Sequence, residues 1–128
     1  MASRVLNCLI DGLRYPKFRK WGFYATLIRT PWFCVKLLRF DANGELSYQM
    51  HQHRTEIWVF LRGKGKITYR LHNEPPQYRC FGWVNGWLEV WKIEPQGWHC
   101  FRAFSKPVYA LEFQYGPKVT ETDIERAE

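Results

Sequence analysis

Apolar runs recur along the chain, and short segments with turn-forming residues separate them. The runs are rich in Val, Ile, Leu, Phe, Tyr and Trp, which favours strands over helices. The predicted strands lie near residues 23–28, 33–40, 45–50, 56–62, 65–70, 87–93, 98–104 and 107–115. Several short strands at close spacing are typical of an antiparallel sandwich or barrel, so the pattern predicts an all-β domain.

The segments between these runs carry clear turn signals. Asp41–Gly44 contains Asn-Gly, and Arg62–Gly65 is suited to a tight hairpin loop. No long segment has a sustained helical period. Helical signals occur only at the ends, in a short N-terminal stretch and from Thr120 to Ala127, where Thr120 or Thr122 is a candidate cap. Residues 1–19 are interpreted as a basic N-terminal arm or edge element, and residues 20–128 as the main domain.

Length and composition narrow the class of protein. The chain has 128 residues, enough for one domain, and 18% of them are aromatic, which supplies a large buried area for its size. Its net charge of +7 favours anionic partners. Neither a basic run nor a nucleic-acid motif accompanies this charge, so we expect no nucleic-acid partner. No apolar run is long enough for a membrane span and no secretory signal is evident, which together predict a cytoplasmic protein.

Three histidines and one glutamate form a candidate metal site. If one strand holds both His51 and His53, the two imidazoles point to the same face. Glu56 follows after a short bend, and His99 begins a later strand after the turn at residues 95–97. An H-x-H pair is common by chance, but the added Glu56, Gly63 and His99 favour metal binding. Such a set suits one divalent ion (Zn, Mn, Fe, Ni or Co) and leaves two positions of an octahedral ion open.

These residues resemble the first motif of the cupin superfamily, a glycine, H-x-H, a glutamate and a later glycine. The string Gln49–Trp58 is similar to the Q-M-H-x-H-R-x-E-x-W string of the type II mannose-6-phosphate isomerase cupin domain. Three weaker matches flank it in order: Trp21–Tyr24 for W-G-x-Y, Phe33–Lys36 for F-x-V-K, and Thr122–Arg126, after Gly116, for the closing acidic-Asp-Ile-x-Arg pattern. The resemblance therefore spans about residues 20 to 126.

The chain departs from the family pattern in two places. The second cupin motif is one residue shorter between Gly97 and His99, although the spacing from Ile93 to His99 is retained, so His99 is still expected at the metal. The segment from Asn73 to Trp87 is longer than in typical members and is interpreted as a loop near the pocket mouth. The nucleotidyltransferase domain of the bifunctional members has no counterpart, so we expect a stand-alone domain.

The resemblance implies a fold, a reaction and a set of residues. The fold is the cupin-type double-stranded β-helix, a jelly-roll barrel, here with short terminal extensions. The implied reaction is the interconversion of mannose 6-phosphate and fructose 6-phosphate, or of a related sugar phosphate. The implied metal ligands are His51, His53, Glu56 and His99, and the implied substrate-binding residues are Lys36, Gln49, Arg54 and Arg126. Lys36, Gln49 and Arg126 are also the catalytic candidates, and the catalytic base is not identified.

Two other functions fit the same residues. One is a different metal-dependent cupin enzyme, such as a small-molecule dioxygenase, and the other is a non-catalytic module that binds a sugar or a metal. A fold hosts many functions, so the sequence alone does not choose among them. Because an exposed sheet edge in a small β-rich domain needs cover, we expect a homodimer.

Overall fold

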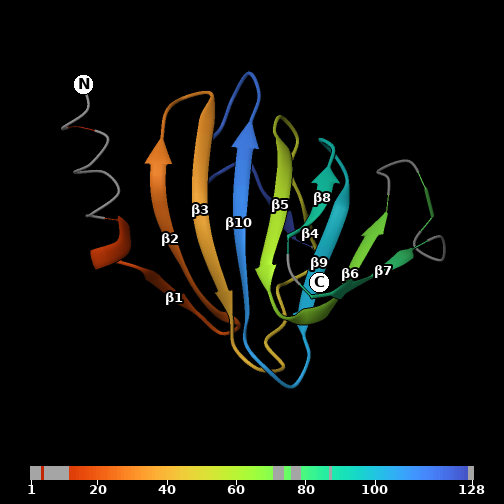
Figure 1. The fold of residues 1–128 in the computed structure, drawn as a ribbon. Coiled ribbons are helices and arrows are strands. Elements are labelled where there is room, and N and C mark those ends of the chain that lie inside the picture. Colours follow the sequence, from red (N-terminus) through yellow and green to blue (C-terminus); the bar gives the residue numbers. More distant parts are fainter. Residues whose placement is uncertain (1–3, 5–11, 71–73, 76–78, 87, 127–128) are drawn as a thin grey trace.

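The computed structural model describes residues 4, 12–70, 74–75, 79–86 and 88–126, and it confirms the all-β fold as a sandwich of two antiparallel sheets (Figure 1). The six-stranded sheet has the order β1-β2-β3-β10-β5-β8, and the five-stranded sheet has the order β11-β4-β9-β6-β7. The strands are β1 (Lys17–Arg19), β2 (Gly22–Arg29), β3 (Phe33–Phe40), β4 (Gln49–Met50), β5 (Thr55–Arg62), β6 (Lys64–Arg70), β7 (Cys80–Asn85), β8 (Glu89–Ile93), β9 (Trp98–Ala103), β10 (Val108–Tyr115) and β11 (Glu125–Arg126). In the described part of the chain, no helix has the length and apolar character of a membrane span.

The first and the last described strands each form the edge of a sheet. β1 lies inside the segment expected as an arm or edge element, and it forms the edge of the six-stranded sheet by pairing with β2. The predicted helix from Thr120 to Ala127 is wrong over its described residues, because β11 pairs there with β4. The Asp123 carboxylate accepts hydrogen bonds from the distant amides of Gln52 and His53, so it does not cap a local helix. Tertiary hydrogen bonds thus override a weak helical signal.

The insertion between β6 and β8 contains a strand that the sequence analysis treated as a loop. β7 pairs with β6 over six residue pairs and extends the five-stranded sheet (Figure 1). Gly82 and Val84 of β7 are buried, whereas Phe81 and Trp83 are exposed. A Cβ atom on Gly82 would lie 2.0 Å from a ring carbon of Trp91, so the glycine allows the two sheets to approach. Asn73, residues 76–78 and Trp87 of this insertion lie outside the described residues.

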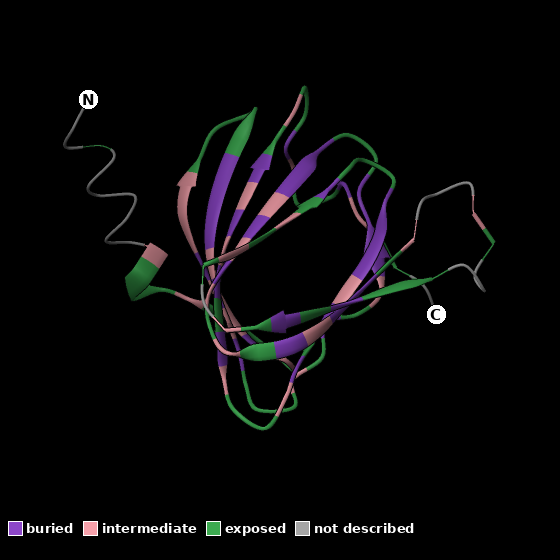
Figure 2. Ribbon diagram, turned by 45° about the vertical axis from the view of Figure 1, so that its right-hand side comes forward, coloured by how far each residue is buried: buried purple, intermediate pink, exposed green. Residues whose placement is uncertain are grey.

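One half of the space between the sheets is an apolar core. It includes Leu38 and Phe40 of β3, Phe60 of β5 and Phe101 of β9, all buried (Figure 2). The Phe101 ring lies 4.7 Å from that of Phe40 and 4.8 Å from that of Phe60. Rings packed at these distances bury large apolar areas and supply most of the driving force for folding.

The same strands carry polar side chains on the same inward face, toward their other ends. We call this group the polar layer; it consists of Lys36, Glu56, His99, Glu112 and Gln114, and each residue is buried. On three strands an apolar core residue and a residue of the polar layer are only two or four positions apart. These pairs are Leu38 and Lys36, Phe60 and Glu56, and Phe101 and His99. Alternate residues of a strand share a face, so a short step along each strand moves from core to candidate site.

Candidate metal centre

Three side chains of the predicted ligand set converge on one buried point. His51 follows β4, Glu56 lies on β5 and His99 lies on β9, and their ligand atoms are within 4.8 Å of one another. The Nε2 atom of His51 is 3.0 Å from Oε2 of Glu56, and Nε2 of His99 is 3.3 Å from Oε1 of the same carboxylate. The three residues are 1–3% exposed, so water contributes little to their solvation.

Backbone carbonyls orient both imidazoles of this triad. Nδ1 of His51 lies 2.5 Å from the carbonyl oxygen of Asp123, and Nδ1 of His99 lies 3.0 Å from that of Gly97. A carbonyl oxygen only accepts, so each Nδ1 donates its hydrogen. In the neutral tautomer each Nε2 therefore directs a lone pair towards Glu56, which is the arrangement of metal-binding histidines.

The triad has the electrostatics of a site for a cation. Burial opposes the ionisation of Glu56, but His51 and then His99 outweigh it and hold the pKa of this carboxyl well below its usual range. Burial also opposes the charging of His99, but the adjacent Glu56 carboxylate raises its pKa. Nε2 of His99 is buried and makes no hydrogen bond of good geometry. Two imidazole nitrogens and a carboxylate around one point fit a divalent transition-metal ion.

The structure does not bring His53 to this point. His53 is exposed, and it is outside the group of side chains whose ligand atoms meet. The expectation that His51 and His53 share a face required a strand through both residues. β4 ends at Met50, and residues 52–53 form a bend whose amides bond to Asp123, so the alternation of side chains is lost there.

Arg54, expected as a substrate-binding residue, also lies against the triad. Its Nε donates to Oε2 of Glu56 at 2.9 Å, and one terminal nitrogen is 3.1 Å from Nε2 of His51. The other terminal nitrogen donates to the carbonyl oxygen of Thr120 at 3.1 Å. Burial opposes the charge of Arg54, but Glu56 outweighs burial and raises its pKa. The guanidinium therefore engages donor atoms that a metal ion would also use.

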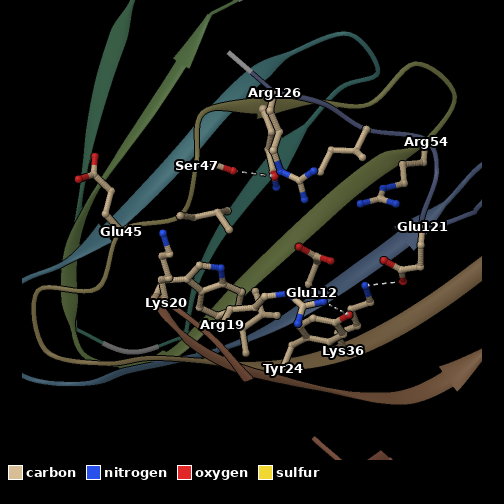
Figure 3. Close-up of a pocket in the computed structure, with 15 residues that line it drawn as sticks. Arg19, Lys20, Tyr24, Lys36, Glu45, Ser47, Arg54, Glu112, Glu121 and Arg126 are labelled. Atoms are coloured by element: carbon tan, nitrogen blue, oxygen red, sulfur yellow. Dashed lines mark hydrogen bonds and ion pairs between the residues drawn. The ribbon is translucent and has the colours of Figure 1, made fainter. Parts of the chain in front are cut away.

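A pocket of about 420 Å³ opens beside Arg54 (Figure 3). All four predicted substrate-binding residues, Lys36, Gln49, Arg54 and Arg126, line it. Nζ of Lys36 is 2.7 Å from Oε1 of Glu121 and 4.4 Å from the centre of the Tyr24 ring. The structure thus places the predicted substrate residues in one cavity, with Arg54 between that cavity and the triad.

Three acidic residues of the site were missed by the sequence analysis. Glu112 lines the pocket from β10, Glu121 holds Lys36, and Asp123 fixes His51 and its neighbours. Glu112 and Gln114 stand two residues apart inside an apolar strand, and that spacing is a signal for two polar side chains on one face. Glu121 and Asp123 lie in an irregular segment, where no periodic pattern indicates the direction of a side chain.

Comparison with known proteins places the chain in a family. The family described as mannose-6-phosphate isomerase C-terminal matches residues 13–128. Mannose-1-phosphate guanylyltransferase of Escherichia coli is 41% identical over 51 residues, which are 40% of this chain and 11% of that protein. The alginate biosynthesis protein AlgA of Pseudomonas aeruginosa is 28% identical over 116 residues, which are 87% of this chain and 21% of that protein. The chain thus spans about a tenth to a fifth of the length of these relatives.

Solved structures confirm the cupin fold. The capsular polysaccharide assembling protein CapF of Staphylococcus aureus superposes with a TM-score of 0.77 at 18% identity, over 89% of this chain and 32% of that one. Oxalate decarboxylase of Bacillus subtilis superposes with a TM-score of 0.76 at 13% identity, over 92% of this chain and 30% of that one. At these identities the likeness concerns the fold alone.

Proposed function

The chain belongs to the mannose-6-phosphate isomerase C-terminal family, and on this premise we propose that it is a metal-dependent aldose–ketose isomerase for mannose 6-phosphate, fructose 6-phosphate or a related sugar phosphate. The observation that carries the proposal is the buried triad of His51, Glu56 and His99 beside a pocket with cationic side chains. Location in the cytoplasm and assembly as a homodimer stay predictions.

The residues of the triad and of the pocket would have different roles in isomerisation. His51, Glu56 and His99 would hold one divalent ion, which supplies a Lewis acid for the oxygen that becomes negative as the enediol forms. Arg126 and Lys36 offer charge-assisted hydrogen bonds to a phosphate group. Gln49 is buried at the pocket wall, where its amide is suited to a sugar hydroxyl. Arg54 shields the triad from the open pocket.

The test is an isomerase assay on protein with a defined metal content. The purified chain is stripped with a chelator, reloaded with Zn, Mn, Fe, Ni or Co, and assayed for interconversion of mannose 6-phosphate and fructose 6-phosphate. We expect activity with at least one metal, loss of metal and activity in His99→Ala, and a smaller effect in His53→Ala, since His53 lies outside the triad. A fully metal-loaded chain that converts neither sugar phosphate overturns the proposal.

One observation favours a second candidate, a non-catalytic module that binds a sugar phosphate. The Arg54 guanidinium already forms an ion pair with Glu56 and contacts His51, so two residues of the triad have a cationic partner without a metal. In that case calorimetry would detect sugar phosphate binding to chelator-treated protein, and loading with metal would produce no turnover. An isomerase binds its substrate and also converts it, so the same samples separate the two functions.

A further inference from the structure

Glu112 is a buried carboxylate of the pocket, and the proposed function gives it no role. It lies on β10 and is 6% exposed, and Figure 3 shows its carboxylate directed into the cavity. The pocket has two other carboxylates. Glu121 is paired with Lys36, and Glu45 is exposed. Among the described residues no cation forms an ion pair with Glu112, since Lys36 pairs with Glu121 and Arg54 with Glu56.

The neighbours of Glu112 hold it in place without neutralising it. In the sheet it stands opposite Lys36 of β3 on one side and Trp58 of β5 on the other. The side-chain amide of Gln114 donates a hydrogen bond to its Oε1 atom. Lys36 is directed to Glu121 and to the face of Tyr24, so its charge is shared with other groups. The free oxygen of Glu112 therefore faces the cavity from a fixed position.

The surroundings of Glu112 also favour its protonated form more than water does. Burial, and then the charge of Glu56, raise the pKa of Glu112, while Lys36 and Arg54 oppose this rise. A carboxylate buried beside a second negative charge binds a proton more readily than an exposed one. General acid–base groups are most effective when their pKa is close to the working pH.

Building on the proposed isomerase function, we propose that Glu112 is the catalytic residue that carries the proton between C2 and C1 of the sugar phosphate. The carboxylate removes the proton from C2 of the aldose, and the C–H electron pair forms the double bond between C1 and C2. The π pair of the carbonyl moves to O1, which takes up a proton from water. The carboxylic acid returns its proton to C1, water takes the O2 proton, and the O–H electron pair forms the carbonyl at C2. Atoms and electrons balance without an oxidant or a reductant.

The other polar groups of the pocket are less suited to this step. The earlier catalytic candidates were Lys36, Gln49 and Arg126. Lys36 is bound to Glu121, the guanidinium of Arg126 has no acceptor atom, and Gln49 carries a neutral amide. Glu56 is committed to the histidines and Arg54. Gln114, which bonds to Glu112, is a positioning residue.

The test compares Glu112→Gln with Glu45→Gln, a control at an exposed carboxylate of the same pocket. Metal content, the Kd for mannose 6-phosphate by calorimetry, kcat for isomerisation, and exchange of the C2 hydrogen with deuterated water by NMR are measured for each. For Glu112→Gln we expect unchanged metal content, a Kd within about threefold, and a loss of kcat and exchange of about 100-fold or more. Glu45→Gln keeps kcat within about threefold, since an exposed group away from the reacting atoms contributes little.

Each outcome assigns the failure to one proposal. If the wild-type chain isomerises and Glu112→Gln retains more than a tenth of its kcat, Glu112 is not the catalytic residue and the isomerase function stands. If the metal-loaded wild type neither isomerises nor exchanges the C2 hydrogen, both proposals are wrong. Should Glu112→Gln fail to fold, Glu112→Asp replaces it in the test. If Glu112 transfers the proton, the shorter carboxylate lowers kcat while metal content and the Kd stay constant. An unchanged kcat in Glu112→Asp overturns the proposal.

Discussion

The two halves of the interior are built on the same strands but differ in their chemistry. On β5, Phe60 lies in the apolar core, and Glu56, four residues earlier, lies at the candidate metal centre. On β9 the corresponding residues are Phe101 and His99. The core gains free energy from burial, whereas each buried polar group costs free energy unless it finds partners. The burial of the apolar half therefore supplies the free energy that keeps the buried polar side chains together.

The largest expected effect tests the apolar half alone. Phe60→Ala removes a fully buried ring that contacts Phe101 and Trp58, and it should lower the free energy of unfolding by about 3–5 kcal/mol. Urea unfolding followed by tryptophan fluorescence measures the change. Metal bound per folded molecule should stay at the wild-type level. A loss of metal from the fully folded variant would show that the two halves are not separable.

The second effect comes from the polar half. Because a ligand that binds only the folded state stabilises it, a divalent ion at 100 times its Kd should raise the free energy of unfolding by about 2.7 kcal/mol. Thermal unfolding with and without metal, and after chelation, measures this effect. His99→Ala should abolish the shift, and His53→Ala should retain most of it, since His53 is outside the triad. Equal shifts in the two variants would contradict the assignment of His99.

A third experiment concerns Arg54, which lies between the pocket and the triad. Arg54→Met removes a cation that competes with a metal ion for Glu56 and His51, so metal should bind about tenfold more tightly, which is about 1.4 kcal/mol. Competition with a fluorescent zinc chelator measures the change. Arg126→Met, which removes a cation of the same pocket that has no contact with the triad, is the control. Weaker metal binding in Arg54→Met would show that the guanidinium supports the ligands.

The smallest effect lies at the pocket wall. Burial opposes the charge of Glu121, but Lys36 outweighs burial and lowers the pKa of this carboxyl. Its stabilising contribution is therefore present above the ordinary carboxyl pKa and is lost as the pH falls through the lowered value. Glu121→Gln should cost under about 1 kcal/mol at neutral pH, since the carboxylate is half exposed. Urea unfolding should show that this cost vanishes in acid; a constant cost would mean that charge is not its source.

The strands that follow from hydrophobic periodicity were predicted correctly from the sequence. The apolar runs at 33–40, 56–62 and 98–104 closely match β3, β5 and β9, and three of the four predicted ligands, on or beside such strands, form the candidate metal centre. The expectation for His53 relied on a strand that ends at Met50, and the strand β7 was hidden in an insertion. The first error concerns the end of a strand and the second the existence of one, and both depend on tertiary hydrogen bonds rather than on pattern.

The polar residues show the same limit. Glu112 is a single acidic residue inside an apolar run, and sequence alone does not tell whether such a residue faces a cavity or solvent. Glu121 and Asp123 reach the site from a segment without regular structure. Their roles arise from contacts between residues that are 70 or more positions apart, such as those between Asp123 and the amides of Gln52 and His53.

The contact of Asp123 with His51 separates the tether of this imidazole from the strands of the core. Every strand of the apolar half is complete by Tyr115, but the carbonyl that orients His51 and the carboxylate that fixes its neighbours belong to residue 123. A protease cut between Gly116 and Asp123 would therefore leave every core strand intact and break the covalent link between the core and the tether of His51.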